Sequence, residues 1–444
     1  MDIYKKSLKG NIYLKIGGII LIGLLLLIPT AMIESIINER QTTQENAINE
    51  VSSKWGQQQI ISGPFISIPY YKYVRETTGK DSSKIVQIKD YIHILPTQLN
   101  VSGDLNPEKR HRGIYEIVVY NSRLNVSGEF SKIDLKALDI PLQNILFDKA
   151  EFVLGIDDLR GIEKQLNLNW NGQKIAFNPG VSSGDVVSSG LNAVLSLPPS
   201  DSSKYNFNFS LDLKGSQRLY FVPVGKVTDV TMASEWSNPS FNGAFLPDSS
   251  NVTDNGFKAN WNVLHLNRNY PQQWTGEQHA ISESSFGIDL LVPVDNYQKS
   301  YRAIRYAILF IGLTFLAFFF IEVLNKTFIH PVQYILVGIA LVVFFTLLIA
   351  ISEHLNFNSA FIVSAIATLL LIAGYVKAIL KSNKLTLFIS GILLLLYTFI
   401  FVIIQLQDYA LLIGSIGIFI ILAIVMYFSR QIDWYNLNLS EKSE

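Results

Sequence analysis

The sequence predicts a membrane α-helical protein of about six transmembrane helices with a large, mostly antiparallel, sandwich-like β domain outside the cytoplasm. Three observations predict this class. Of the 444 residues, 49% are hydrophobic and only 16% are charged, whereas about a quarter of the residues of a soluble protein carry charge. Apolar runs long enough to cross a bilayer lie near the N-terminus and in the last third of the chain. Between them, apolar and polar residues alternate as in strands with one buried face.

The first apolar run predicts an uncleaved membrane anchor. Residues 16–33 contain no charge, and Lys5, Lys6, Lys9 and Lys15 precede them. At about 1.5 Å per residue the run nearly crosses a hydrocarbon core of about 30 Å. The alternative is a cleaved signal peptide, but residues 29–32 lack the small-residue cleavage site that it needs. Apolar residues at helical spacing continue to position 55, so we expect residues 34–55 to form a helical stalk.

The C-terminal block, residues 303–428, predicts five further spans. The candidate segments are 303–323, 332–351, 359–376, 385–404 and 409–428. Six spans place both termini on one side. The excess of Lys and Arg at the N-terminus and in alternate short loops assigns that side to the cytoplasm. We therefore expect residues 1–15 and 429–444 inside the cell and residues 34–302 outside it.

Period-two alternation predicts the β domain. It is clearest in residues 205–214, 257–265 and 286–294, and it indicates antiparallel sheets in a sandwich or an incomplete barrel. The sequence Leu-Asn-Val-Ser-Gly occurs at 99–103 and again at 124–128. We expect these copies to form two related strands that flank a third strand at 114–120.

Composition and motifs predict no catalytic, cofactor-binding or metal-binding residue. Lys plus Arg and Asp plus Glu total 36 each, which argues against a nucleic-acid partner, and there is no cysteine. Residues 180–184 match the G-x-S-x-G nucleophile pattern, but that chemistry needs a strand before it and a helix after it. The Ser- and Gly-rich surroundings favour a loop. The six histidines lack the spacing of a zinc site. We expect no cofactor.

Charged residues at the predicted span ends are the next candidates. Glu322 and His330 lie at the inner ends of two spans, and Glu353 and His354 lie at an outer end. Intramembrane charges are costly and often functional. Because all four lie at span ends, we favour helix capping or charge pairing over a proton or ion relay. In the β domain, residues 110–116 and 155–161 concentrate charge. Each segment could be a binding surface or a turn held by a salt bridge, and we favour the turn.

Several short motifs follow one another along nearly the whole chain. They include Trp55-Gly-Gln-Gln-Gln59, Pro107-Glu-Lys-Arg-His-Arg-Gly-Ile-Tyr115, Gly155-Ile-Asp-Asp-Leu-Arg-Gly161, Ser234-Glu-Trp236, Pro293-Val-Asp-Asn-Tyr297, His330-Pro-Val-Gln-Tyr334 and Ser352-Glu-His354. Read in this order, they resemble the CreD family of bacterial inner membrane proteins. The resemblance implies a role in envelope integrity, envelope stress and tolerance of colicins and β-lactams. It implies no reaction. The motif residues whose role is open are Trp55, Gln59, Arg110, Arg112, Asp157, Arg160, Trp236, Asp295, Arg302, Glu322, His330, Glu353 and His354.

The preferred hypothesis is a non-enzymatic protein of the bacterial inner membrane. Its helices contact the lipid bilayer, and its periplasmic β domain binds an envelope protein or a glycan. The first alternative is a transporter or channel built by the C-terminal helices, which needs an ionisable residue deep in a span. The second is a membrane enzyme acting on lipid or glycan, which needs Glu353, His354, Asp289 and Arg302 to converge at one cavity.

Overall fold

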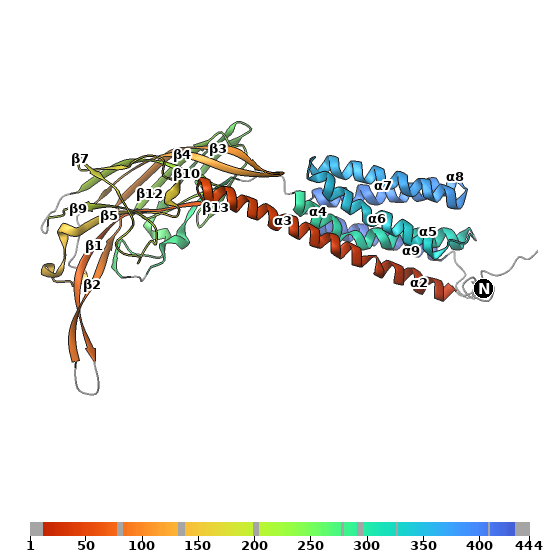
Figure 1. The fold of residues 1–444 in the computed structure, drawn as a ribbon, viewed down its shortest axis with the longest axis horizontal. Helices are drawn as coiled ribbons and strands as arrows, with labels where there is room; N and C mark the ends of the chain where they lie inside the picture. Colours follow the sequence, from red (N-terminus) through yellow and green to blue (C-terminus); the bar gives the residue numbers. More distant parts are fainter. Residues whose placement is uncertain are drawn as a thin grey trace, which may run out of the picture. The chain divides into compact units, whose positions relative to one another are not determined.

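The computed structural model describes residues 12–77, 83–131, 138–198, 204–276, 279–290, 296–325, 327–406 and 409–430. They form two compact units. The β unit is Glu45–Pro293, and the helical unit joins Met1–Gln44 to Val294–Glu444. Figure 1 shows the helices of one unit and the sheets of the other.

Six helices in the described part of the chain are long and apolar enough to cross a membrane, which confirms the predicted number. The first candidate runs from Leu14 to Trp55. Before the second, a short helix that the sequence did not predict ends at Arg305, and the chain turns at Tyr306 before the apolar helix begins. The helices are α2 (Ile12–Leu25), α3 (Leu27–Trp55), α4 (Asn296–Arg305), α5 (Ala307–Leu324), α6 (Pro331–Ser352), α7 (Phe357–Leu380), α8 (Asn383–Gln405) and α9 (Ala410–Ser429).

An aromatic cluster forms the centre of the helical unit. The Tyr397 ring of α8 lies 4.8 Å from the rings of Phe310 and Phe344, measured between centroids. Phe361 of α7 packs against Phe344 at 5.3 Å. The contacts of Phe344 with Tyr397 and Phe361 are edge-to-face, and such contacts add to the free energy gained by burying the rings. The cluster joins α5, α6, α7 and α8, whereas α9 has no buried residue.

The β unit consists of two open sheets that are mostly antiparallel. The nine-stranded sheet has the order β13-β17-β11-β1-β5-β9-β8, with β2 paired to β1 and β16 paired to β2. The eight-stranded sheet has the order β14-β15-β12-β3-β4-β10-β6-β7. The parallel pairs are β1 with β11 and β3 with β12. The strands are β1 (Gln59–Thr77), β2 (Ser83–Ile94), β3 (Gln98–Arg112), β4 (Tyr115–Phe130), β5 (Ala150–Ile156), β6 (Asn167–Trp170), β7 (Gln173–Ala176), β8 (Asn178–Pro179), β9 (Gly190–Leu195), β10 (Tyr205–Ser216), β11 (Arg218–Val222), β12 (Val227–Ser234), β13 (Pro239–Gly243), β14 (Ser249–Thr253), β15 (Gly256–Leu264), β16 (Gln273–Thr275) and β17 (Phe286–Leu290).

The two sheets share one apolar core, as the prediction of a sandwich requires. Phe152 of β5, in the nine-stranded sheet, lies 5.3 Å from Phe207 of β10, in the eight-stranded sheet. Trp261 of β15 likewise lies 5.7 Å from Phe286 of β17. All four side chains are almost fully buried. These contacts between sheets fix the register of the alternating strands, because a slip of one residue would turn their apolar faces to solvent.

The predicted arrangement of the short repeat is wrong. The two copies lie in β3 and β4, which pair directly with each other as Leu99↔Gly128 and Gly103↔Leu124. No third strand lies between them, because the turn at Gly113 folds the chain back at once. The segment at 114–120 is the first half of β4.

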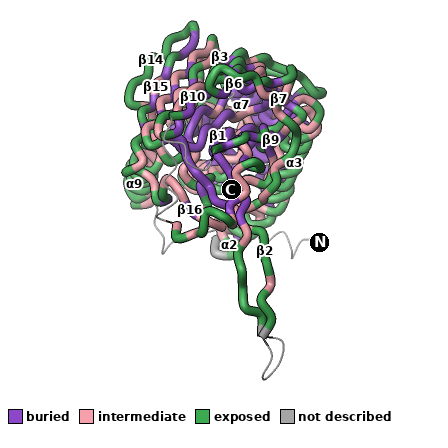
Figure 2. The backbone as a smooth tube through the Cα atoms, turned by 90° about the vertical axis from the view of Figure 1, so that its left-hand side faces the viewer, coloured by how far each residue is buried: buried purple, intermediate pink, exposed green. Residues whose placement is uncertain are grey.

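Strands β1 and β2 form a long hairpin that extends beyond the rest of their sheet (Figure 2). Its outer half, from Tyr71↔Lys89 to Thr77↔Ser83, pairs only within the hairpin among the described residues. It exposes Tyr73, Val74, Ile85 and Ile88. Clustered exposed apolar residues commonly mark interaction sites.

Candidate functional site

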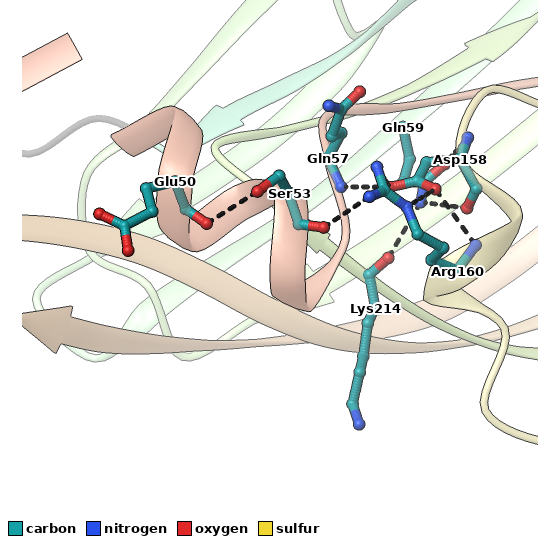
Figure 3. Close-up of polar contacts among 7 residues, drawn as sticks. All are labelled: Glu50, Ser53, Gln57, Gln59, Asp158, Arg160 and Lys214. Carbon is teal, nitrogen blue, oxygen red and sulfur yellow. Dashed lines mark hydrogen bonds and ion pairs between the residues drawn. The ribbon is translucent and has the colours of Figure 1, made fainter. Parts of the chain in front are cut away.

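Two of the motifs meet where α3 ends. Trp55 and Gln59 flank the passage from α3 into β1. After β5, Asp158 caps the 3-10 turn Leu159–Gly161, and Arg160 lies within that turn (Figure 3). Lys214, near the end of β10, lies against the same turn. We call Trp55, Gln59, Asp158, Arg160 and Lys214 the α3-end cluster. All five lie in the β unit.

An ion pair between neighbouring residues organises this turn. Arg160 donates from Nε to Asp158 Oδ1 at 2.8 Å and from Nη2 to Oδ2 at 3.1 Å. The backbone N–H of Gln57 donates to the same carboxylate at 2.9 Å. Burial opposes ionisation of Asp158, but these hydrogen bonds outweigh it and hold the pKa of the carboxyl below its usual range. Asp158 therefore stays ionised and fixes the Arg160 guanidinium.

The fixed guanidinium reaches the last turn of α3. Arg160 Nη1 donates to the carbonyl oxygen of Ser53 at 2.6 Å. The last carbonyls of a helix have no partner within the helix, so a side-chain donor there satisfies a group that would otherwise need water. Gly161 allows the turn to approach β10 closely, because a Cβ at this position would overlap the Lys214 carbonyl.

Gln59 joins the turn to β10. Its amide donates from Nε2 to the carbonyl oxygens of Asp158 at 3.0 Å and Lys214 at 3.1 Å. Its Oε1 accepts the Asp158 N–H at 3.2 Å. Gln59 is fully buried, so a residue without these groups would leave buried backbone polar atoms unpaired.

Trp55 and two arginines complete the attachment of α3. The Trp55 ring lies beneath the guanidinium of Arg110, at 4.8 Å, and the ammonium of Lys214, at 4.7 Å. Cations over an indole face are favourable. Arg112 pairs with Glu50 of α3 at 3.2 Å. The structure thus brings together five of the motif residues, Trp55, Gln59, Arg110, Arg112 and Arg160.

Three other motif residues do not join this cluster. Asp157 is exposed, and its neighbour Asp158 makes the contacts instead. The Trp236 indole donates to the Asn238 carbonyl at 3.0 Å, away from the cluster. Asp295 lies outside the described residues. The sequence does not show which of two adjacent aspartates is buried and which is exposed, because this depends on the backbone conformation.

At one end of the helical unit, the charged motif residues bind separate partners. Glu353 Oε1 lies 3.3 Å from Arg40 Nε and accepts the Tyr297 hydroxyl at 3.4 Å. Arg302 donates to the Leu406 carbonyl at 3.5 Å. The backbone N–H of His354 donates to the carbonyl oxygen of Ile351, at the end of α6. In the β unit, Asp289 binds Arg218 at 2.6 Å.

At the other end, Glu322 forms a buried ion pair with Lys15 of α2. Only 1% of Glu322 is exposed, and it also accepts the Tyr334 hydroxyl and the Ile329 N–H, each at 3.1 Å. His330 instead caps α6 and accepts the Val332 N–H at 3.3 Å. The sequence placed Lys15 before the first span but gave no signal that it faces Glu322, because the two residues are 307 positions apart.

A second polar group is buried in the nine-stranded sheet. His93 is 1% exposed and lies 3.4 Å from the Ser67 hydroxyl, through Nδ1, and 3.3 Å from the Asp185 carboxylate, through Nε2. A Ser-His-Asp hydrolase uses the opposite nitrogens, and Ser67 is only 3% exposed. Strand β9 follows the loop at 180–184 instead of the helix that a nucleophile turn needs. These contacts therefore indicate a structural role: His93 connects the loop that carries Asp185 to the nine-stranded sheet.

The fold and these contacts define a polytopic membrane protein with a two-sheet β unit inserted after its first membrane helix. The chain belongs to the CreD family: the sequence profile described as "Inner membrane protein CreD" matches residues 11–435. Inner membrane protein CreD of Escherichia coli (strain K12) is 34% identical over 440 residues, which cover 97% of this chain and 96% of that protein.

Similarity to solved structures is weak. An M1 zinc metallopeptidase from Deinococcus radiodurans aligns over 38% of each chain with 9% identity and a TM-score of 0.20. A two-domain M1 zinc metallopeptidase mutant bound to L-tryptophan aligns over 38% of this chain and 39% of its own, with 10% identity and a TM-score of 0.18.

Proposed function

We propose that this protein supports envelope integrity as a non-enzymatic component of the bacterial inner membrane and contributes to tolerance of envelope stress, β-lactams and colicins. The observation that carries the proposal is the α3-end cluster. Its polar groups bind one another and the end of a helix, and its only fully buried side-chain amide, that of Gln59, is used for backbone contacts. These contacts join the last turns of α3 to the strands and turns of the β unit and leave no reactive group free within the cluster.

The proposed topology is N-in and C-in, with residues 34–302 in the periplasm between a first span at 16–33 and a block of five spans at 303–428. The distribution of Lys and Arg supports it. A reporter enzyme that is active only outside the cytoplasm, fused after Gly128, should be active. The same reporter fused after Glu444 should be silent. An active fusion at Glu444 would overturn the assignment.

The proposed partner of the β unit is an envelope protein or a glycan, and the outer half of the β1–β2 hairpin supports such a contact. Tyr73 is 57% exposed and Ile85 is 64% exposed. A hairpin paired only with itself is marginally stable in water, so apolar residues on it gain from a partner. Crosslinking in intact cells from position 73 or 85, compared with the exposed control position 251 on β14, would identify that partner.

Deleting the gene tests the functional proposal. The strain should become more sensitive to detergent and to β-lactams, and the intact gene should restore resistance. Unchanged behaviour under all of these conditions would refute the proposed role.

A further inference from the structure

We propose that a groove between α5, α8 and α9 binds one acyl chain of an anionic phospholipid, whose phosphate lies at Lys384 and Arg430. The groove belongs wholly to the helical unit and has a volume of about 410 Å³. Its lining is aliphatic or aromatic except for one residue, Asn325, at one end. A cavity of this character accepts a hydrocarbon chain and offers no polar partner along its length.

The length of the groove matches one leaflet. Its wall on α5 runs from Leu313 to Asn325, and its wall on α8 runs from Leu385 to Leu396. At about 1.5 Å per residue these walls are roughly 18 Å and 17 Å long. Half of a hydrocarbon core of about 30 Å is about 15 Å. An extended acyl chain entering from one membrane surface would therefore fill the groove.

The weak packing of α9 indicates that the space is not closed by protein. No residue of α9 is buried, although Ile421, Ile424, Val425 and Phe428 line the groove. The Phe428 ring meets Phe320 of α5 at 6.3 Å, at the polar end of the groove. A hydrocarbon chain between α9 and the other two helices would supply the contacts that the protein side chains do not make.

The charges at the polar end select the head group. Lys384 directly precedes the lining residue Leu385, and Arg430 lies two positions after Phe428. Both cations are exposed, and no ion pair joins either of them to a described residue. The Arg430 guanidinium lies 4.3 Å from the centroid of the Tyr427 ring, which leaves its charge available to a phosphate. The carboxylate of Glu322, on the same end of α5, is already bound to Lys15. Basic residues at the mouth of a pocket between membrane helices favour anionic head groups.

A second groove offers an internal control. It lies between α2 and α5, has a volume of about 420 Å³ and is entirely apolar. The cation beside its lining residue Ile16 is Lys15, which Glu322 neutralises. This groove should accept hydrocarbon without preference for an anionic head group.

The test is native mass spectrometry of the full-length protein in neutral detergent, after incubation with equal amounts of dioleoyl phosphatidylglycerol and dioleoyl phosphatidylcholine. We expect one phosphatidylglycerol molecule to be retained preferentially. Ala317→Phe, which fills the groove, should abolish this retention. Gly312→Phe should preserve it, because position 312 lines the other groove and has open space around it.

Lys384→Gln and Arg430→Gln keep the groove intact and test the head group separately. Each should reduce the preference for phosphatidylglycerol roughly fivefold, since a basic residue near an anionic surface contributes about 1 kcal/mol. Equal retention of the two lipids by the unaltered protein would overturn the proposal. So would unchanged retention by Ala317→Phe, or a dimer that this variant dissociates, since the occupant would then be a second copy of the chain.

Discussion

The guanidinium of Arg160 binds two structures at once: it holds the Asp158 carboxylate through two nitrogens and donates from the third to the Ser53 carbonyl at 2.6 Å. Ser53 lies in the last turn of α3, whereas Asp158 and Arg160 lie after β5. Because α3 is continuous from Leu27 to Trp55, this contact lies where the chain passes from the helix of its first candidate span into the β unit.

Removing the Arg160 guanidinium should destabilise the β unit. Arg160→Ala leaves a largely buried carboxylate and a helix carbonyl without their donor. We expect a modest fall in the melting temperature, because the arginine itself is 57% exposed. Tryptophan fluorescence reports on this unit, since five of the six tryptophans lie within it.

A matched control is Arg123→Ala, which removes an arginine from an exposed pair with Asp212 in the same unit. Exposed pairs contribute little, so its melting temperature should stay close to that of the unaltered protein. Equal losses in the two variants would show that Arg160 is an ordinary surface charge.

Gly161 should tolerate no side chain. Gly161→Ala forces a methyl group against the Lys214 carbonyl and the Gln59 amide, and such overpacking costs about 1–3 kcal/mol. Gly184→Ala is the control, because its Cβ would meet nothing within 4 Å. Thermal unfolding of both variants checks the expectation. A stable Gly161→Ala protein would mean that the turn and β10 are not in close contact.

The stability of the β unit should depend on pH through His93. Burial lowers the pKa of this imidazole from its usual 6.5, and Asp185 offsets only part of that effect. The unfolded chain therefore binds a proton more readily than the folded protein. Stability is complete above about pH 6.5 and falls as the pH drops toward the lowered pKa.

Unfolding curves between pH 5 and pH 7.5 measure this dependence. His93→Gln should flatten it, whereas His111→Gln, at an exposed position on β3, should leave it unchanged. If the slope survives in His93→Gln, another group controls the transition.

Glu322 and Lys15 should be replaceable only together. Glu322→Gln would leave the ammonium of Lys15 buried without its counter-charge. Breaking one side of a buried pair costs about 3–5 kcal/mol, whereas replacing both sides by apolar residues is often neutral.

Membrane abundance measures the outcome. Glu322→Gln should be depleted, and the double variant Lys15→Met with Glu322→Leu should return toward the normal level and keep antibiotic tolerance. A normally abundant but inactive double variant would contradict a structural role and favour proton transfer through Glu322.

The features that could be predicted from the sequence are those that depend on the pattern of residues close together in the chain. The lengths of the apolar runs predicted the six candidate spans. The alternation of apolar and polar residues predicted strands such as β10, in which the apolar side chains are buried and most of the intervening polar ones are exposed. Contacts between distant residues were not predictable. Lys15 and Glu322 meet only because α2 packs against α5, and the pairing of β3 with β4 depends on the turn at Gly113. The motifs identified Arg160 and Trp55. They could not show that Arg160 binds the last turn of α3, the helix that Trp55 ends.

The most direct test of the account combines Trp55→Ala with Arg160→Ala and measures β-lactam and detergent tolerance in a strain that lacks the natural gene. Trp236→Ala serves as the control, because its indole lies outside the α3-end cluster. If the β unit acts through its attachment to α3, the double variant should fail to restore tolerance even when its membrane abundance equals that of the control, which should restore it. Full tolerance with the double variant at equal abundance would contradict the account.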